Sequence, residues 1–537
     1  MADLLVTGCI FTADDHQPWA EALVARDGVI VHVGTIDDAP AVANARHIDA
    51  GGGVVIPGFV DGHAHVVSAG SALTRSALRP CTTLEQIQSE LLAWVGANPD
   101  APRVLGVGWV FTAVPGGKPT RHMLDTIIPD RPVYLDASDL HSVWCNSAAL
   151  AELGIDDDTP DPIGGQIVRD AHGVATGHLL ENAGYHIAWP VVNRRSEADT
   201  DRFLQAAVSA YLASGTTAAV DMALESQALR AMVRADERGE LPFTIVAHWL
   251  IDRTGDPATE LEQVREAAAM MQQHPSGRVR VVGIKLITDG TIDGCTAGMC
   301  HPFTNDEPGE MVWPREALEP VVLAADEAGL QIAMHAIGDL AVRTALDVLE
   351  VAKARREERG DTRERRHRIE HLEYVDPVDI PRLAPLGVTA SMQPVHVDPA
   401  YLGNWIELLG PERAKWGFAW PEYLAHGTTL AFGTDVPTAA HHPLPNMFIA
   451  ATRRSPYVAD AEPLRPDFAL PLEAAVVHGT RESAWASFEE GRRGSLRAGL
   501  AADLVVLDRN PFEEGPDSLL HTRVVTTVVA GDVVYTG

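Results

Sequence analysis

Apolar runs of strand length alternate with amphipathic helical stretches through most of this 537-residue chain, and this alternation restricts the fold more than any other feature. Segments such as DLAVRTALDVLEVAKARREERG place apolar residues three and four apart, as helices do. The strand-like runs are VVIPGFVDGHAH, TTAAVDM, FTIVAHWL, VRVVGIKLIT, LQIAMHA, HRIEHLE, GVTASMQ and TTLAFGTD. Eight strands that alternate with helices predict an α/β fold, a TIM-like (β/α)8 barrel.

Both ends of the chain show the alternating pattern of antiparallel strands instead. Since neither end makes a convincing domain alone, we expect residues 1–57 and 489–537 to form one composite β-sandwich. The barrel then occupies residues 58–488. Residues from about 70 to 205 do not fit the repeat, and we interpret them as an insertion after strand 1 that packs over the barrel mouth.

Composition narrows the function classes. The net charge is −32, from 42 basic and 74 acidic residues, which argues against a nucleic-acid or anionic-membrane surface. We see neither a bilayer-spanning run nor a signal peptide at Met1. Five scattered cysteines indicate a reducing compartment. We therefore expect a cytoplasmic homodimer that acts on a small molecule.

The run VVIPGFVDGHAH ends in His63 and His65. Side chains two apart on a strand point the same way, so both imidazoles can converge on one point. Imidazole is the commonest protein ligand for zinc-type metals. Two polar histidines at a strand end would be the structural alternative for an isolated HxH motif.

Four later runs end in Lys285, His335, His371 and Asp435. Barrel enzymes carry their active sites at the carboxyl ends of the strands, so these side chains should meet the two histidines there. Each one alone has a structural explanation, such as a turn cap or a wall residue. Their convergence indicates a two-metal hydrolase site.

These motifs resemble the amidohydrolase superfamily, and more narrowly its YtcJ-like branch (amidohydrolase family 3), which includes N-substituted formamide deformylases. The matching segments are PGFVDGHAH, HSVWCNSAAL, IKLITDGTIDG, MHAIGD, RIEHLE, FGTD and GSLRAGLAADLVVLDRNPF. The resemblance covers essentially the whole chain. It implies the barrel, the composite sandwich and the insertion.

The resemblance also implies a set of metal ligands. His63, His65 and Asp435 would hold the more buried metal, and His335 and His371 the more exposed one. Lys285 occupies the bridging position, where the superfamily often carries an N6-carboxylysine; an unmodified Lys285 with a single metal is the alternative. We expect one or two divalent metals, zinc first among them.

Divalent metal lowers the pKa of bound water toward 7. Asp435 would take the proton of that water and pass it to the leaving nitrogen. The predicted function is hydrolysis of a C–N bond of a small amide, N-formyl or cyclic amide compound by metal-bound hydroxide. The alternatives are an ester, lactone or carbamate hydrolase, a heterocycle deaminase, and a non-catalytic small-molecule-binding regulator.

Four further residues are weaker candidates for substrate contacts. Glu181 would touch metal or substrate, or be a solvated carboxylate on a helix face. His141 and Asn146 would line the pocket, or form a structural polar cluster. Asp289 would orient a metal ligand, or simply form a turn.

Overall fold

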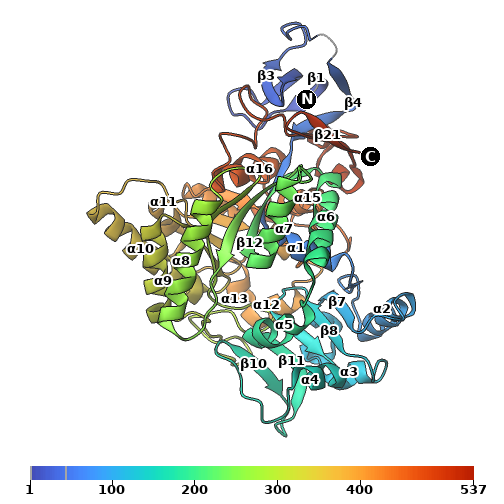
Figure 1. Ribbon diagram of the computed structural model, residues 1–537, viewed down its shortest axis with the longest axis vertical. Coiled ribbons are helices and arrows are strands. Elements are labelled where there is room, and N and C mark those ends of the chain that lie inside the picture. The colour runs from blue at the N-terminus through green and yellow to red at the C-terminus, as the bar shows by residue number, and fades with distance from the viewer. Residues whose placement is uncertain (1–2, 43–44) are drawn as a thin grey trace.

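A barrel of eight parallel strands forms the centre of the computed structural model, which describes residues 3–42 and 45–537 (Figure 1). Its strands are β5 (Phe59–Ala64), β12 (Thr216–Leu224), β13 (Thr244–Leu250), β14 (Val279–Ile287), β15 (Gln331–Ala336), β16 (Arg368–His371), β17 (Thr389–Met392) and β18 (Leu430–Phe432). They neighbour one another in sequence order. Just beyond β18, the Asp435 amide donates to the His63 carbonyl at 2.8 Å and brings the last strand to the first. The predicted barrel is confirmed.

Helices cover the outside of the barrel (Figure 1). The longer ones are α6 (Glu197–Ala213), α7 (Ser226–Glu237), α8 (Pro257–Gln273), α9 (Arg315–Ala328) and α10 (Asp339–Glu358). α6 begins at a capping box in which Ser196 and Asp199 each bond the backbone of the other, and α9 ends at Gly329, whose φ of 84° suits glycine. None of the helices in the described ranges combines the length and the apolar composition of a bilayer-spanning segment.

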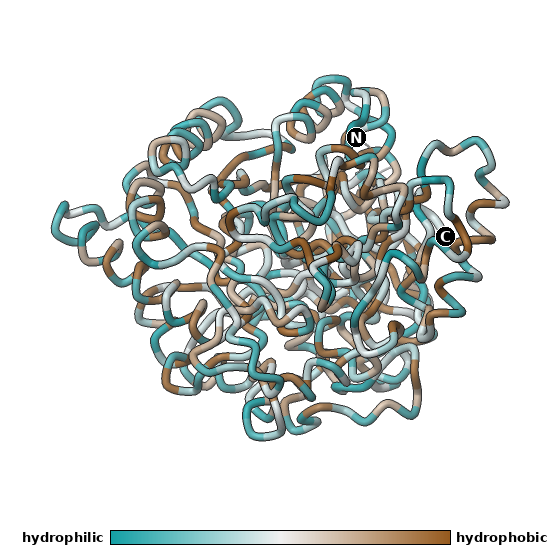
Figure 2. Tube along the Cα trace, turned by 90° about the horizontal axis from the view of Figure 1, so that it is seen from below, coloured by the Kyte–Doolittle hydropathy of each residue, from teal (hydrophilic) through white to brown (hydrophobic). Residues whose placement is uncertain are grey.

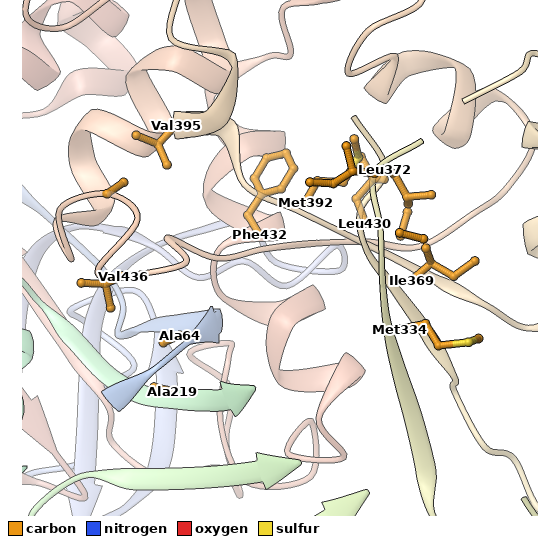
Figure 3. Close-up of a cluster of buried hydrophobic side chains, with 14 of the residues drawn as sticks. Ala64, Ala219, Met334, Ile369, Leu372, Met392, Val395, Leu430, Phe432 and Val436 are labelled. Atoms are coloured by element: carbon orange, nitrogen blue, oxygen red, sulfur yellow. The ribbon is translucent and has the colours of Figure 1, made fainter. Parts of the chain in front are cut away.

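The barrel core is continuous from strand to strand. Figure 3 shows apolar side chains of successive strands, among them Met334, Ile369, Met392 and Leu430, which are completely buried. The peripheral helix turns and loops are mostly hydrophilic (Figure 2). The core therefore holds the strand ends, and the side chains they carry, on a rigid support.

The two ends of the chain meet in one seven-stranded sheet, at the top of Figure 1. Its strands, in spatial order, are β21 (Asp532–Thr536), β20 (Val524–Val529), β19 (Leu504–Leu507), β4 (Arg46–Pro57), β1 (Leu4–Phe11), β2 (Trp19–Arg26) and β3 (Val29–Gly34). β4 lies parallel to β1 and antiparallel to β19, so it joins the N-terminal strands to the C-terminal ones. This confirms the composite domain. The run that contains VVIP and FVDGHAH divides between this sheet and the barrel at Gly58.

A six-stranded sheet lies between β5 and β12 in the sequence, at the bottom of Figure 1. Its strands are β10 (Gly165–Arg169), β11 (Ala175–Glu181), β9 (Ser142–Cys145), β8 (Val133–Ala137), β7 (Val104–Trp109) and β6 (Ser76–Ala77). The sheet has apolar clusters of its own around Trp109, Trp144 and Tyr134. A short π-helix (Gly184–Ala188) and α5 (Trp189–Val192) follow β11 and face the barrel mouth.

Candidate metal centre and its cavities

His63, on β5, contacts a buried ion pair on β16, across the barrel interior. Its Nδ1 lies 2.6 Å from Oε2 of Glu370, whose Oε1 accepts from Nε of Arg368, also at 2.6 Å. Burial raises the pKa of Glu370, but Arg368 and His63 outweigh it and hold that pKa well below its usual range. The carboxylate therefore takes the Nδ1–H of His63 and leaves Nε2 with a free lone pair.

Asp435 faces both histidines of the HxH motif. It follows β18 with a φ of 55°, and its Oδ1 lies 3.2 Å from Nε2 of His63 and 3.2 Å from Nε2 of His65. Within the described part of the chain, His63 Nε2 and Asp435 Oδ1 are buried polar atoms without a hydrogen-bond partner. Such atoms are costly unless something satisfies them, and a cation bound between them would satisfy both. The donor set therefore fits a divalent metal.

His371 completes the tightest group. One ligand atom each of His63, His371 and Asp435 lie within 4.8 Å of one another. Nδ1 of His371 bonds Oε1 of Gln393 at 2.8 Å and lies 4.0 Å from Oδ2 of Asp435. Burial, and then the neighbouring His335, lower the pKa of His371 well below its usual value, so its imidazole is neutral and able to bind metal.

His335 lies edge-on to His371, with the two ring centroids 4.5 Å apart and the ring planes at 63°. Its Nε2 lies 3.2 Å from the Gly290 carbonyl and 3.5 Å from Oδ1 of Asp289. Asp289 is buried and accepts the backbone N–H groups of Gly298, Ile337 and Gly338. Asp289 thus fixes the loop after β14 to the end of β15, beside His335.

Lys285 lines the same cavity from β14 and is almost fully buried. Burial lowers its pKa to about 8, although the charges of Glu370 and Asp435 oppose the shift. A lysine with such a pKa has far more neutral amine at pH 7 than an ordinary one. Neutral amine is the form that reacts with carbon dioxide to give a carbamate.

His396 is a residue that the sequence reasoning missed. Its Nε2 lies 3.4 Å from Oδ2 of Asp435, and its Nδ1 lies 3.2 Å from Oε1 of Glu373. Burial opposes protonation, but bonds to these two carboxylates raise the pKa of His396 to about 9. His396 follows β17, a strand to which the sequence motifs assign no site residue, as they assign none to β12 and β13. Its position just past a strand end was the one signal that could have identified it.

The weaker candidates divide between the cavity and the scaffold. His141 and Glu181 face each other at 2.6 Å, and Glu181 ends strand β11 rather than lying on a helix. His141 lines the cavity, with its ring centroid 4.7 Å from that of His335. Asn146 caps α4 (Ser147–Leu153). Its side-chain oxygen accepts from the backbone N–H groups of Val133 and Ala149, and its side-chain nitrogen donates to the carbonyls of Ile128 and Arg131. The structure therefore places Asn146 in the scaffold.

Two cavities come together at the centre. The larger, about 550 Å³, is lined by strand ends of the barrel and by the insertion. The smaller, about 90 Å³, extends toward the segment after β17. The residues shared by both linings are Asp139, His141, His335, His371, Asp435 and Thr438. A ligand whose carbonyl group lies at these shared residues can therefore place one part in each cavity.

A (β/α)8 barrel that gathers imidazoles and one carboxylate around two unsatisfied buried atoms defines the class of metal-binding barrel proteins. Residues 46–535 match the amidohydrolase family, and the chain belongs to that family. It is 30% identical to the amidohydrolase YtcJ of Bacillus subtilis over 98% of both chains. It is 27% identical to N-substituted formamide deformylase of Arthrobacter pascens, over 100% of this chain and 98% of that one.

Solved structures agree with the fold. A metal-dependent hydrolase of uncharacterised activity from Pyrococcus horikoshii superposes with a TM-score of 0.74 at 26% identity, covering 95% of this chain and 98% of its own. The family resemblance inferred from the sequence motifs is therefore confirmed.

Proposed function

We propose that the protein is a metal-dependent hydrolase that cleaves a C–N bond of a small amide. The observation that carries the proposal is the pair of buried, unsatisfied atoms, His63 Nε2 and Asp435 Oδ1, at the mouth of the barrel. Membership in the amidohydrolase family and the similarity to an N-substituted formamide deformylase support the reaction type.

Zinc is the metal we propose, since imidazole and carboxylate are ligands that suit it. The proposed ligands are His63, His65 and Asp435 for one metal, His335 and His371 for a second, and Lys285 between them, carboxylated on its amine. Divalent metal at such a site lowers the pKa of water toward 7 and polarises a carbonyl group. His371 lies beside both His63 and Asp435, so these three side chains could hold one metal between them, and the second metal of the proposal rests on the family resemblance.

Asp435 is the proposed general base. Its carboxylate is buried, and burial raises its pKa, but His63 and the neighbouring imidazoles of His396 and His65 outweigh that and hold the pKa well below its usual range. It is therefore ionised and able to accept a proton from the attacking water. The water oxygen bonds to the carbonyl carbon, the C–N bond breaks, and Asp435 passes the proton to the leaving nitrogen.

A panel of substrates tests the reaction type. Zinc-supplemented protein should hydrolyse N-formyl or other simple amides faster than the benzyl ester of the same acyl group, and faster than a lactone. The control is Asp435→Asn, prepared and metal-loaded in the same way. Faster turnover of the ester and lactone than of every amide would replace the proposal with the esterase alternative.

A further inference from the structure

We propose that Tyr185 is a catalytic residue, whose hydroxyl donates a hydrogen bond to the carbonyl oxygen of the amide while water adds to the carbonyl carbon. The inference rests on the proposed C–N hydrolysis. It adds a donor from the inserted segment to a centre whose proposed metal ligands and general base all come from the barrel.

The position of Tyr185 brings its ring to the candidate metal centre. It lies on the π-helix (Gly184–Ala188) that follows β11, and π-helices are rare and occur frequently at functional sites. Tyr185 lines the large cavity together with Asp435. Its ring centroid is 5.8 Å from that of His141, which in turn is 4.7 Å from that of His335. One imidazole therefore separates the phenol ring from a candidate metal ligand.

The hydroxyl of Tyr185 is free to bind a ligand. Within residues 3–42 and 45–537 it forms no hydrogen bond, and it is not closed off inside the protein, so a molecule in the large cavity can reach it. The buried Tyr134 and Tyr211 differ, since their hydroxyls donate to Glu152 at 2.7 Å and to Asp61 at 3.3 Å. A phenol that faces a cavity without a protein partner is available to a substrate.

Other groups at this place are already engaged. Thr438 lines both cavities, but its hydroxyl donates to the backbone carbonyl of Asp435. His141 lines both as well, and its Nδ1 lies 2.6 Å from Oε2 of Glu181. Tyr185 therefore offers the cavity a donor that does not have to give up a contact within the protein.

Tyr185 is a donor at every pH at which the enzyme would work. Burial, and then the carboxylates of Glu181, Asp139 and Asp435, raise the pKa of Tyr185 well above its usual value. The phenol therefore keeps its proton and stays neutral.

The reaction needs such a donor at one atom. As water adds to the carbonyl carbon, the carbonyl oxygen gains negative charge, and a donor fixed at that oxygen lowers the energy of the transition state more than that of the bound substrate. Tyr185 gives up no proton in this step. Its hydroxyl hydrogen stays on the phenol while Asp435 takes the proton of the water.

Tyr185→Phe tests the inference, because it removes the hydroxyl and keeps the ring. The substrate is the amide that the zinc-supplemented wild type hydrolyses fastest. We expect kcat to fall by about 100-fold, the usual loss for one such donor, while KM, zinc content and the urea midpoint stay near those of the wild type. The matched control is Tyr457→Phe, since Tyr457 is exposed and lines neither cavity. It should retain wild-type kcat.

An inhibitor gives a readout that a structural role would not change. The probe is the phosphonamidate analogue of the same amide, in which a tetrahedral phosphorus with an anionic oxygen replaces the carbonyl carbon. Its inhibition constant should rise in Tyr185→Phe by about the factor by which kcat/KM falls.

Three results would overturn the inference and leave a C–N hydrolase. They are a kcat near that of the wild type in Tyr185→Phe, a raised KM with unchanged kcat, and loss of zinc or of the fold, which would make the hydroxyl a structural group. A wild type that hydrolyses no amide would instead refute the proposed function, on which the inference rests.

Discussion

Nδ1 of His63 lies 2.6 Å from Oε2 of Glu370, and neither side chain has more than 1% of its surface exposed. The two residues are 307 positions apart in the sequence and meet across the barrel interior. This contact determines which nitrogen of His63 is available to a metal. It also connects the candidate metal centre to the buried Arg368, whose guanidinium further bonds the Gly62 carbonyl.

Glu370→Gln should weaken zinc binding by about 10- to 100-fold, the usual effect of changing a residue that orients a metal ligand. The amide oxygen can still accept from Nδ1–H of His63, but it carries no charge to balance Arg368. Zinc titration against a chelator measures the effect, after circular dichroism has verified the fold. The matched control is Glu412→Gln, whose side chain is 86% exposed. Equal affinities in folded wild type and Glu370→Gln would contradict the assigned role.

Asp435→Asn should lower kcat by about 100- to 10,000-fold, the usual range for loss of a general base. The amide cannot accept a proton from water, although it still fits the same space. Steady-state kinetics on protein of known metal content separates loss of the base from loss of metal. A folded, metal-loaded variant with kcat near that of the wild type would rule out Asp435 as the base.

Lys285→Ala should remove activity if a carbamate bridges two metals, because no other group then stands between them. Propionate or acetate should restore part of the activity, since a short carboxylate can replace the missing carbamate. Bicarbonate should raise metal content and activity of the wild type and leave the variant unchanged. Full activity of Lys285→Ala without any added acid would show that Lys285 is not needed at the centre.

Stability should fall in mild acid because of His178. Burial lowers its pKa to about 3, from an ordinary value of 6.5 in the unfolded chain. Between these values the unfolded chain binds more protons, so stability present at neutral pH is lost as pH falls through 6.5. When the pH falls from 7 to 5, this residue should lower the free energy of unfolding by about 2 kcal/mol.

Between pH 7 and pH 5, the free energy of unfolding of His178→Phe should therefore fall by about 2 kcal/mol less than that of the wild type. Urea unfolding at the two pH values measures both differences. His172→Phe, an exposed histidine of the same segment, is the control and should retain the wild-type pH dependence. If His178→Phe and the wild type lose the same stability, the proton linkage assigned to His178 is wrong.

Much of the fold could be predicted because each barrel strand is a short apolar run that ends in a turn. The strand ends of His63, His335 and His371 follow from the same pattern. Glu370 could not be predicted as the partner of His63, since an acidic residue inside an apolar run has no sequence signal for the ion pair it makes. His396 follows a strand that carries no motif of its own. Only the structure shows its role, because there its imidazole lies beside the carboxylate of Asp435.

For Asn146 the sequence left two roles open, a pocket residue and part of a structural polar cluster, and its contacts are those of the structural role. It lies in a motif that resembles the family, but its side chain fills the backbone bonds at the start of α4. Sequence patterns do not distinguish a helix cap from a cavity residue when both are polar and buried. The small cavity could not be predicted from the sequence either, since its lining comes from segments as distant in the chain as Phe111 and Leu402.

The most direct test of the central claim is elemental analysis of the protein purified without added metal, before and after chelation. We expect at least about one equivalent of zinc or another divalent metal per chain, loss of amide hydrolysis on chelation, and recovery when zinc is restored. In Asp435→Asn the metal content should fall below that of the wild type. Well under one equivalent of any transition metal, with no gain of activity when metal is added, would contradict the account.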